Sequence, residues 1–210
     1  MAELAENPLA PTPPVEHATT HFDGNIDSPS ENRKLAMWLF LASECMFFAV
    51  LIAGYVYARF KYPEIHAILN IPLTSLNTFM LLMSSFTVVR ALAAIQAGDR
   101  KKFVRSLAMT AILGILFLTV QASEYSNLAQ EGLILGGSSQ SALFGMAFFT
   151  LTGFHGAHVL IGVIWLIFVF LKSFNGGFSK EDHFGVEFFG LYWHFVDVVW
   201  IIIFTVVYLI

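Results

Sequence analysis

Five long apolar stretches dominate the pattern of hydrophobic and polar positions along this chain. They lie at about residues 35–58, 73–95, 105–123, 141–171 and 186–209. An α-helix rises about 1.5 Å per residue, so about 20 apolar residues cross the ~30 Å hydrocarbon core of a bilayer. The stretches lack the alternation typical of barrel strands, and a backbone in lipid must satisfy its own hydrogen bonds. The pattern therefore predicts an all-α fold, a polytopic membrane protein with a bundle of five transmembrane helices.

The first 32 residues differ from the rest of the chain. They hold most of the prolines and several acidic residues, and no long apolar run. They also lack the basic start, short apolar core and small-residue cleavage site of a secretory signal. We therefore expect a flexible, disordered aqueous tail at 1–32, followed by a five-helix transmembrane domain at 33–210.

Composition agrees with a membrane protein and narrows its chemistry. The chain is 57% hydrophobic and 12% charged, with a mean hydropathy of +0.70, which leaves too little polar surface for an ordinary soluble domain. Cys45 is the only cysteine, so the chain cannot build an intrachain disulfide, a Cys-x-x-Cys-His haem attachment or a multi-thiolate metal site. It has no Gly-rich phosphate loop or nucleotide motif, and we expect no nucleic-acid partner.

The lysines and arginines divide unevenly between the two sides that five helices define. One side has only Arg59 and Lys61. The other has Arg33, Lys34, Arg90, Arg100, Lys101, Lys102, Arg105, Lys172 and Lys180. The positive-inside rule then predicts that the N-terminus is inside and the C-terminus outside. The basic run at 100–102 has two interpretations, a topology signal or a surface for anionic lipid head groups.

Ionisable residues recur inside three of the apolar stretches. Glu44 lies roughly 16 Å into the membrane from the basic residues that precede the first stretch. His155 and His158 share one face of the fourth stretch, and His194 and Asp197 share one face of the fifth, because residues three apart lie on the same side of a helix. Inside a membrane such groups face a protein interior and pair with one another.

Two interpretations of these five residues stay open. Histidine with carboxylate suits iron, copper or zinc, which would make the chain an independent haem or metal electron carrier built on His155, His158 and His194. Alternatively, the residues form a buried hydrogen-bonded network between helices. The network is favoured because the spacing defines no coordination geometry, and it predicts no catalytic residue, metal or cofactor in this chain. In it, Asp197 is the expected partner of His194, and Glu44 is expected to be protonated unless a histidine of the fourth or fifth stretch pairs with it.

Two further groups of residues carry expectations. Gln121, Glu124 and Tyr125 lie near the outer end of the third stretch, where we expect a solvated or interfacial role. The fourth stretch carries small residues that would let a neighbouring helix approach closely. These are Gly145, Gly153, Gly156 and Gly162.

Five runs of residues follow one another in a recognisable order. They are GDRK at 98–101, LTVQASEY at 118–125, TGFHGAHV at 152–159, HFG at 183–185 and YWHFVDVVW at 192–200. Together they closely resemble subunit III of the haem-copper terminal oxidases, from about Leu35 to the C-terminus. Glu44 resembles the buried carboxylate of that family. The resemblance implies a short form from a bacterial plasma membrane, equivalent to the last five of the seven helices in the long mitochondrial form.

The resemblance also implies a function. Subunit III of a proton-pumping oxygen reductase holds no haem or copper, which belong to partner subunits. It packs against catalytic subunit I, has subunit II and a small fourth subunit as further partners, and supports stability, proton uptake and oxygen access. It binds phospholipid, for which the head-group candidates here are Arg100, Lys101, Lys102 and His183.

Two further expectations concern the electron donor and the two helices that the long form has in addition. The GDRK and QASEY runs are more similar to the cytochrome c oxidase branch, and a quinol oxidase is the alternative. The first two helices of the long form make a V-shaped lipid cleft with the other five, and they have no counterpart here. We expect helices of a neighbouring subunit in their place.

Overall fold

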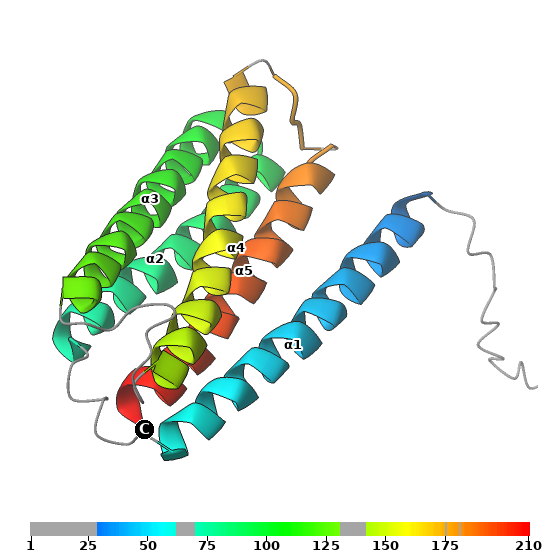
Figure 1. Cartoon of the computed structure of the whole chain (residues 1–210). Helices are drawn as coiled ribbons and strands as arrows, with labels where there is room; N and C mark the ends of the chain where they lie inside the picture. Colours follow the sequence, from blue (N-terminus) through cyan, green and yellow to red (C-terminus); the bar gives the residue numbers. More distant parts are fainter. Residues whose placement is uncertain (1–28, 62–69, 131–141, 175, 181) are drawn as a thin grey trace, which may run out of the picture.

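The structure, a computed structural model, describes residues 29–61, 70–130, 142–174, 176–180 and 182–210 (Figure 1). Its helices are α1 (Pro29–Lys61), α2 (Ile71–Gln96), α3 (Arg100–Gln130), α4 (Ala142–Phe174) and α5 (Phe184–Phe204), and α5 continues into one turn of π-helix, η2 (Thr205–Leu209). All five helices are long and apolar enough to cross a membrane, and the described residues contain no strand. The predicted all-α, five-helix membrane fold is confirmed.

The helices run beyond the apolar stretches that predicted them. α3 extends from Arg100 to Gln130, whereas its apolar stretch covers 105–123. Hydropathy marks only the part of a helix that lipid surrounds, while the backbone hydrogen bonds continue into the polar interface. α1 begins at Pro29, a residue type that suits the first turn of a helix, so the end of the predicted 1–32 tail belongs to α1. Residues 1–28 of that tail and residue 141 lie outside the described part of the chain.

Helix α1 is the least enclosed of the five. It lies against α4 and α5, while α2, α3, α4 and α5 pack together as a bundle (Figure 1). Only 17% of its most apolar window is buried, against 56% for the last helix. Its C-terminal end is held by Arg59, which donates to the carbonyl of Ile210, and its N-terminal end diverges from the bundle (Figure 1). Much of its apolar surface is therefore left uncovered by this chain.

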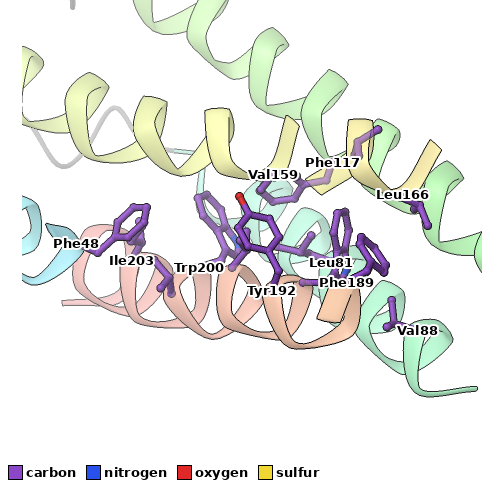
Figure 2. Packing of buried hydrophobic residues seen from close by; sticks show 14 of the residues in the cluster. Phe48, Leu81, Val88, Phe117, Val159, Leu166, Phe189, Tyr192, Trp200 and Ile203 are labelled. Atoms are coloured by element: carbon purple, nitrogen blue, oxygen red, sulfur yellow. The ribbon is translucent and has the colours of Figure 1, made fainter. Parts of the chain in front are cut away.

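Two tryptophans of α5 form the centre of the bundle. Trp193 and Trp200 are almost completely buried, and each indole N–H donates to a hydroxyl of α2 at 2.9 Å, Trp193 to Ser84 and Trp200 to Thr78. Around them pack Leu81 and Val88 of α2, Phe117 of α3 and Val159 and Leu166 of α4 (Figure 2). Because neither indole nitrogen is left unpaired in an apolar interior, these bonds fix α5 against α2.

Glycines on two neighbouring helices make room for Trp193. A methyl group at Gly162 of α4 would lie 2.8 Å from Cζ3 of the indole, and one at Gly114 of α3 would lie 2.9 Å from Cη2. Gly162 thus has the close-approach role expected for glycines of this helix. Gly156 does not, because a methyl group there would meet no atom of another described helix within 4 Å.

Each of the five helices has one of its ends at the same end of the molecule. The turn between α2 and α3 is made by Gly98, whose φ of 78° favours glycine, and by Asp99, whose carboxylate accepts from the Lys102 N–H at 3.0 Å at the start of α3. The N-terminal ends of α1 and α5 lie at this end as well, with the Lys34 ammonium 5.9 Å from the Phe184 ring centre. The nine basic residues assigned to the inside belong to this half of the molecule.

Candidate functional site

Glu44 of α1 pairs with His158 of α4. The Glu44 Oε2 and His158 Nε2 atoms are 3.2 Å apart, and the two side chains are 21% and 14% exposed. The site is walled by aromatic rings, with the Phe48 ring centre 5.0 Å from that of His158. The pair joins the loosely packed α1 to the rest of the bundle.

The second nitrogen of His158 determines how this pair can share a proton. Nδ1 lies 2.7 Å from the carbonyl oxygen of Phe154, which can only accept, so Nδ1 carries a hydrogen. One further proton lies between Nε2 and Glu44. Either a neutral carboxyl donates to a neutral imidazole, or an imidazolium donates to a carboxylate. Both arrangements satisfy the two polar groups without water.

His155 lies one turn from His158 but in different surroundings. Its side chain is fully buried, its ring is stacked on Trp200 with the ring centres 4.8 Å apart, and the edge of Phe117 is 6.0 Å away. Neither ring nitrogen has a hydrogen-bond partner among the described residues. His155 and His158 therefore lie close together on α4, but only His158 contacts Glu44.

His194 and Asp197 are not bonded to each other in the described residues. His194 Nδ1 is 3.2 Å from the hydroxyl oxygen of Ser85 on α2. The same serine interacts with Asp197, which is buried and whose Oδ1 atom has no hydrogen-bond partner in the described part of the chain. The structure therefore divides the five predicted residues into a Glu44–His158 pair, an aromatic-enclosed His155, and a His194 and Asp197 that meet α2 through Ser85.

None of these clusters forms a ligand set for a metal. Within residues 29–61, 70–130, 142–174, 176–180 and 182–210, no three His, Cys, Asp or Glu side chains converge closely enough to hold an ion. Whether the chain carries a cofactor stays a prediction, which the haem and metal measurement described below tests.

A second polar cluster was not predicted from the sequence. Glu124 of α3 is buried, and its carboxyl group accepts from the Thr74 hydroxyl at 3.0 Å and from the Tyr208 hydroxyl at 3.1 Å. Gln121 Nε2 lies 3.5 Å from the same carboxyl group, and Tyr125 donates to Thr152 of α4 at 2.8 Å. The expected solvated setting is therefore wrong for Gln121 and Glu124, which are both buried. A position at the level of the membrane interface stays a prediction.

The spacing of the buried positions along α3 could have predicted this cluster from the sequence. The buried positions of the helix recur three or four residues apart and include Gly114, Phe117, Gln121, Glu124 and Leu128. Glu124 continues a stripe that faces the bundle. Its closeness to the end of the apolar stretch suggested solvent, whereas its angular position on the helix places it inside.

Glu124→Ala is expected to destabilise the folded chain by about 1 kcal/mol, because the buried Tyr208 hydroxyl loses its acceptor. Thermal unfolding in mild detergent, followed by tryptophan fluorescence, measures this. The matched control is Ser123→Ala, which removes an exposed hydroxyl bonded only within its own helix. Equal stability of the two variants would show that the Glu124 cluster contributes nothing to the fold.

The head-group candidates divide into capping and exposed residues. The Arg100 guanidinium donates to the carbonyl oxygens of Ser173 and Phe174 at 2.8 and 2.7 Å, so it caps the C-terminal end of α4. A hydrogen bond from Lys102 keeps the pKa of the partly exposed Asp99 carboxyl below its usual value. Lys101 is exposed.

His183 is held at the start of α5. Its Nδ1 atom lies 2.8 Å from the Lys180 carbonyl oxygen, and its Nε2 atom lies 3.4 Å from Gln96 Nε2. Lipid contact by any of these four candidates stays a prediction.

A multi-pass helical membrane protein with paired ionisable groups between its helices is the class that this fold and site define. The sequence model of one family, Cytochrome c oxidase subunit III, matches residues 18–210. The chain belongs to this family. The match begins before Leu35, where the recognisable runs had placed the start of the resemblance.

Similar proteins occur in two kinds of oxidase. Cytochrome c oxidase subunit 3 of Bacillus sp. (strain PS3) is 34% identical over 188 residues, which are 88% of this chain and 89% of the relative. The corresponding subunit from Synechocystis is 38% identical over 182 residues, 84% of this chain and 75% of the relative. Cytochrome bo(3) ubiquinol oxidase subunit 3 of Pseudomonas aeruginosa is 32% identical over 196 residues, 92% of each chain.

Proposed function

We propose that this chain is the non-redox subunit III of a proton-pumping haem-copper oxygen reductase of the cytochrome c oxidase type, acting in aerobic respiration. In this role it packs on the catalytic subunit I, contacts subunit II, binds lipid, and supports the stability, proton uptake and oxygen access of the complex. Membership of the subunit III family is the observation that carries the proposal. The uncovered apolar face of α1 supports it, because such a face suits a partner helix or lipid.

Purification in mild detergent tests the proposal. An affinity tag on this chain should recover larger haem-containing polypeptides in fixed proportion, and oxygen consumption should co-purify with them. Recovery of the folded chain alone, from membranes that hold an active oxidase, would contradict the proposal.

The rival interpretation is an independent electron carrier that binds haem or metal through its histidines. A pyridine haemochrome assay and metal analysis of this chain, after separation from its partners, distinguish the two. We expect neither haem nor copper in stoichiometric amount. One haem or one copper per chain would overturn the assignment of a non-redox subunit.

A quinol oxidase is the second candidate, and the Pseudomonas relative supports it because it aligns over 92% of each chain. The electron donor binds other subunits. Assays of the purified complex with reduced cytochrome c and with a reduced quinol decide between them, and we expect turnover with cytochrome c.

We place the chain in a bacterial plasma membrane, with the N-terminus and the α2–α3 turn inside and Ile210 outside. The nine-to-two distribution of basic residues supports this orientation. In a Cys45→Ser background, a membrane-impermeant maleimide added to intact cells should label Lys61→Cys and leave Ala97→Cys unlabelled until the membrane is opened. Labelling of Ala97→Cys alone in intact cells would reverse the orientation.

A further inference from the structure

A basic hollow lies between α2 and α3, near the turn that joins them. It has a volume of about 220 Å³ and is lined by Thr87, Arg90, Lys102, Arg105, Ser106 and Met109. A second hollow of about 420 Å³ adjoins it and shares Arg90, Lys102 and Ser106. The two together form what we call the α2/α3 pocket, which is separate from the Glu44–His158 pair and from the Arg100 cap of α4.

The charges of the α2/α3 pocket do not balance. Three cations line it, and the only acid, Asp99, is 2.8 Å from the Lys102 ammonium. Arg90 and Arg105 make no hydrogen bond or ion pair to any residue that the structure describes, although the Arg90 guanidinium lies 5.9 Å from the centre of the Phe86 ring. Two guanidinium groups therefore face one hollow without an anion.

The depth of these arginines matches the head-group layer of a membrane. Arg90 precedes the end of α2 by six residues and Arg105 follows the start of α3 by five, so their Cα atoms lie roughly 7–9 Å inside the helix ends. Long basic side chains at this depth reach toward the interface, where phosphate groups lie. The guanidinium fork also matches the geometry of a phosphate, which it can bind through two parallel hydrogen bonds.

Apolar stripes lead from the α2/α3 pocket toward the membrane interior. On α2, Met83 and Phe86 are exposed and precede Arg90 at helical spacing. On α3, Met109 and Ile112 are exposed and follow Arg105 in the same way. A ligand with an anionic head and long apolar chains would fit both the basic pocket and the apolar stripes, whereas a soluble anion would use only the pocket.

We propose that the α2/α3 pocket binds an anionic glycerophospholipid, with its phosphate between Arg90 and Arg105 and its acyl chains along the two apolar stripes. The membrane setting follows from the family, and the site deepens the lipid binding in the proposed function, on which it rests. Arg90 and Arg105 thereby gain a role in lipid binding, whereas the sequence alone had assigned them only a role in membrane topology.

Native mass spectrometry of the full-length chain, with the subunits that co-purify, tests the site. The sample is stripped of lipid in mild detergent and titrated with phosphatidylglycerol, phosphatidylcholine or inorganic phosphate. The unaltered protein should bind one phosphatidylglycerol in preference to phosphatidylcholine. Arg90→Gln with Arg105→Gln should weaken that binding about 30-fold, because each basic residue near anionic lipid contributes about fivefold.

Two matched variants separate charge from structure. Lys101→Gln removes an exposed cation on the same turn that does not line the pocket, and it should leave binding unchanged. Arg90→Lys with Arg105→Lys keeps both charges but removes both guanidinium forks, so its binding should lie between that of the double glutamine variant and that of the unaltered protein. Since the mass spectrum reports subunit composition and lipid adducts separately, a failure of the lipid site is distinguishable from a failure of the complex to assemble.

Three results would overturn the inference. One is equal binding of phosphatidylglycerol by the Arg90→Gln, Arg105→Gln variant and the unaltered protein. Another is equal binding of phosphatidylcholine and phosphatidylglycerol. The third is displacement of the bound lipid by millimolar inorganic phosphate, which would assign the pocket to a soluble anion.

Discussion

Gly162→Ala is expected to destabilise the helix bundle by about 1–3 kcal/mol, the usual cost of overpacking a filled core. The added methyl group would stand 2.8 Å from the Trp193 ring, closer than such carbon atoms approach. Trp193 has little room to move, because it is buried and its indole N–H is bonded to Ser84. Relief therefore requires α4 and α5 to separate, which weakens the contact at the centre of the fold.

Gly156→Ala is the matched control, since it makes the same change six residues earlier on the same helix. Apart from the adjoining turns of α4 itself, no atom of the described residues lies within 4 Å of the added methyl group. Alanine favours a helix over glycine by up to about 1 kcal/mol, so this variant should be as stable as the unaltered chain or more so. Thermal unfolding of the separated chain in detergent measures both. Equal destabilisation by the two substitutions would show that Trp193 is not wedged against Gly162.

Glu44→Ala is expected to have the second large effect. It should weaken the association of α1 with the rest of the bundle by about 1–3 kcal/mol. The substitution leaves His158 Nε2 without its partner and opens a cavity between α1 and α4. Because α1 has few other buried contacts, it should separate from the bundle first. The expected phenotype is an oxidase that loses this subunit or loses activity early during sustained turnover.

Proteolysis and subunit content in detergent measure this loss. Ser43→Ala is the control, because its exposed hydroxyl bonds only to the Phe40 carbonyl of the same helix. Glu44→Gln keeps the shape and an acceptor or donor for His158, so it should stay near the unaltered protein. If Glu44→Ala retained α1 and the subunit as well as Ser43→Ala does, the Glu44–His158 pair would not be what holds the helix.

A hydrophobic carbodiimide tests the state of the same pair. The reagent modifies a neutral carboxyl that lipid can reach, and a carboxylate held by an imidazolium is protected. Fast modification of Glu44 would therefore identify the neutral arrangement, and slow modification would identify the imidazolium–carboxylate arrangement. His158→Ala should then accelerate it, because the carboxyl group is left alone in an apolar setting. Equal rates with and without His158 would mean that the pair does not control the proton.

The fold was predictable because a single physical requirement dominates it. A helix in lipid needs about 20 apolar residues, so hydropathy alone located all five helices. Hydropathy could not locate the ends of the helices, because these ends lie in the polar interface of the membrane. Helix α3, which begins at Arg100 and ends at Gln130, is an example. Hydropathy also missed Gly114, a glycine that accommodates Trp193 from α3, because no sequence pattern states which helix lies opposite.

The partners of the polar residues were harder to predict for a related reason. In a soluble protein the apolar face of a helix points inward, but in a membrane both faces are apolar, and hydropathy does not fix the rotation of the helix. The spacing placed His194 and Asp197 on one face, and they do share it, yet both meet Ser85 of α2. The pairing of Glu44 with a histidine of α4 was foreseen only as one of two alternatives. The choice of His158 over His155 required the structure.

Oxygen consumption by a fully assembled Glu44→Gln complex most directly tests whether this chain supports oxygen reduction or performs it. Initial turnover and activity during prolonged turnover are both recorded, with haem content and subunit composition checked on the same sample. We expect an initial rate within about twofold of the unaltered complex, less than about 0.5 kcal/mol in activation free energy, and a working life longer than that of Glu44→Ala. Loss of initial oxygen reduction in a Glu44→Gln complex with all its subunits and haems would show that this carboxyl group carries obligatory proton chemistry, and would contradict a supporting role.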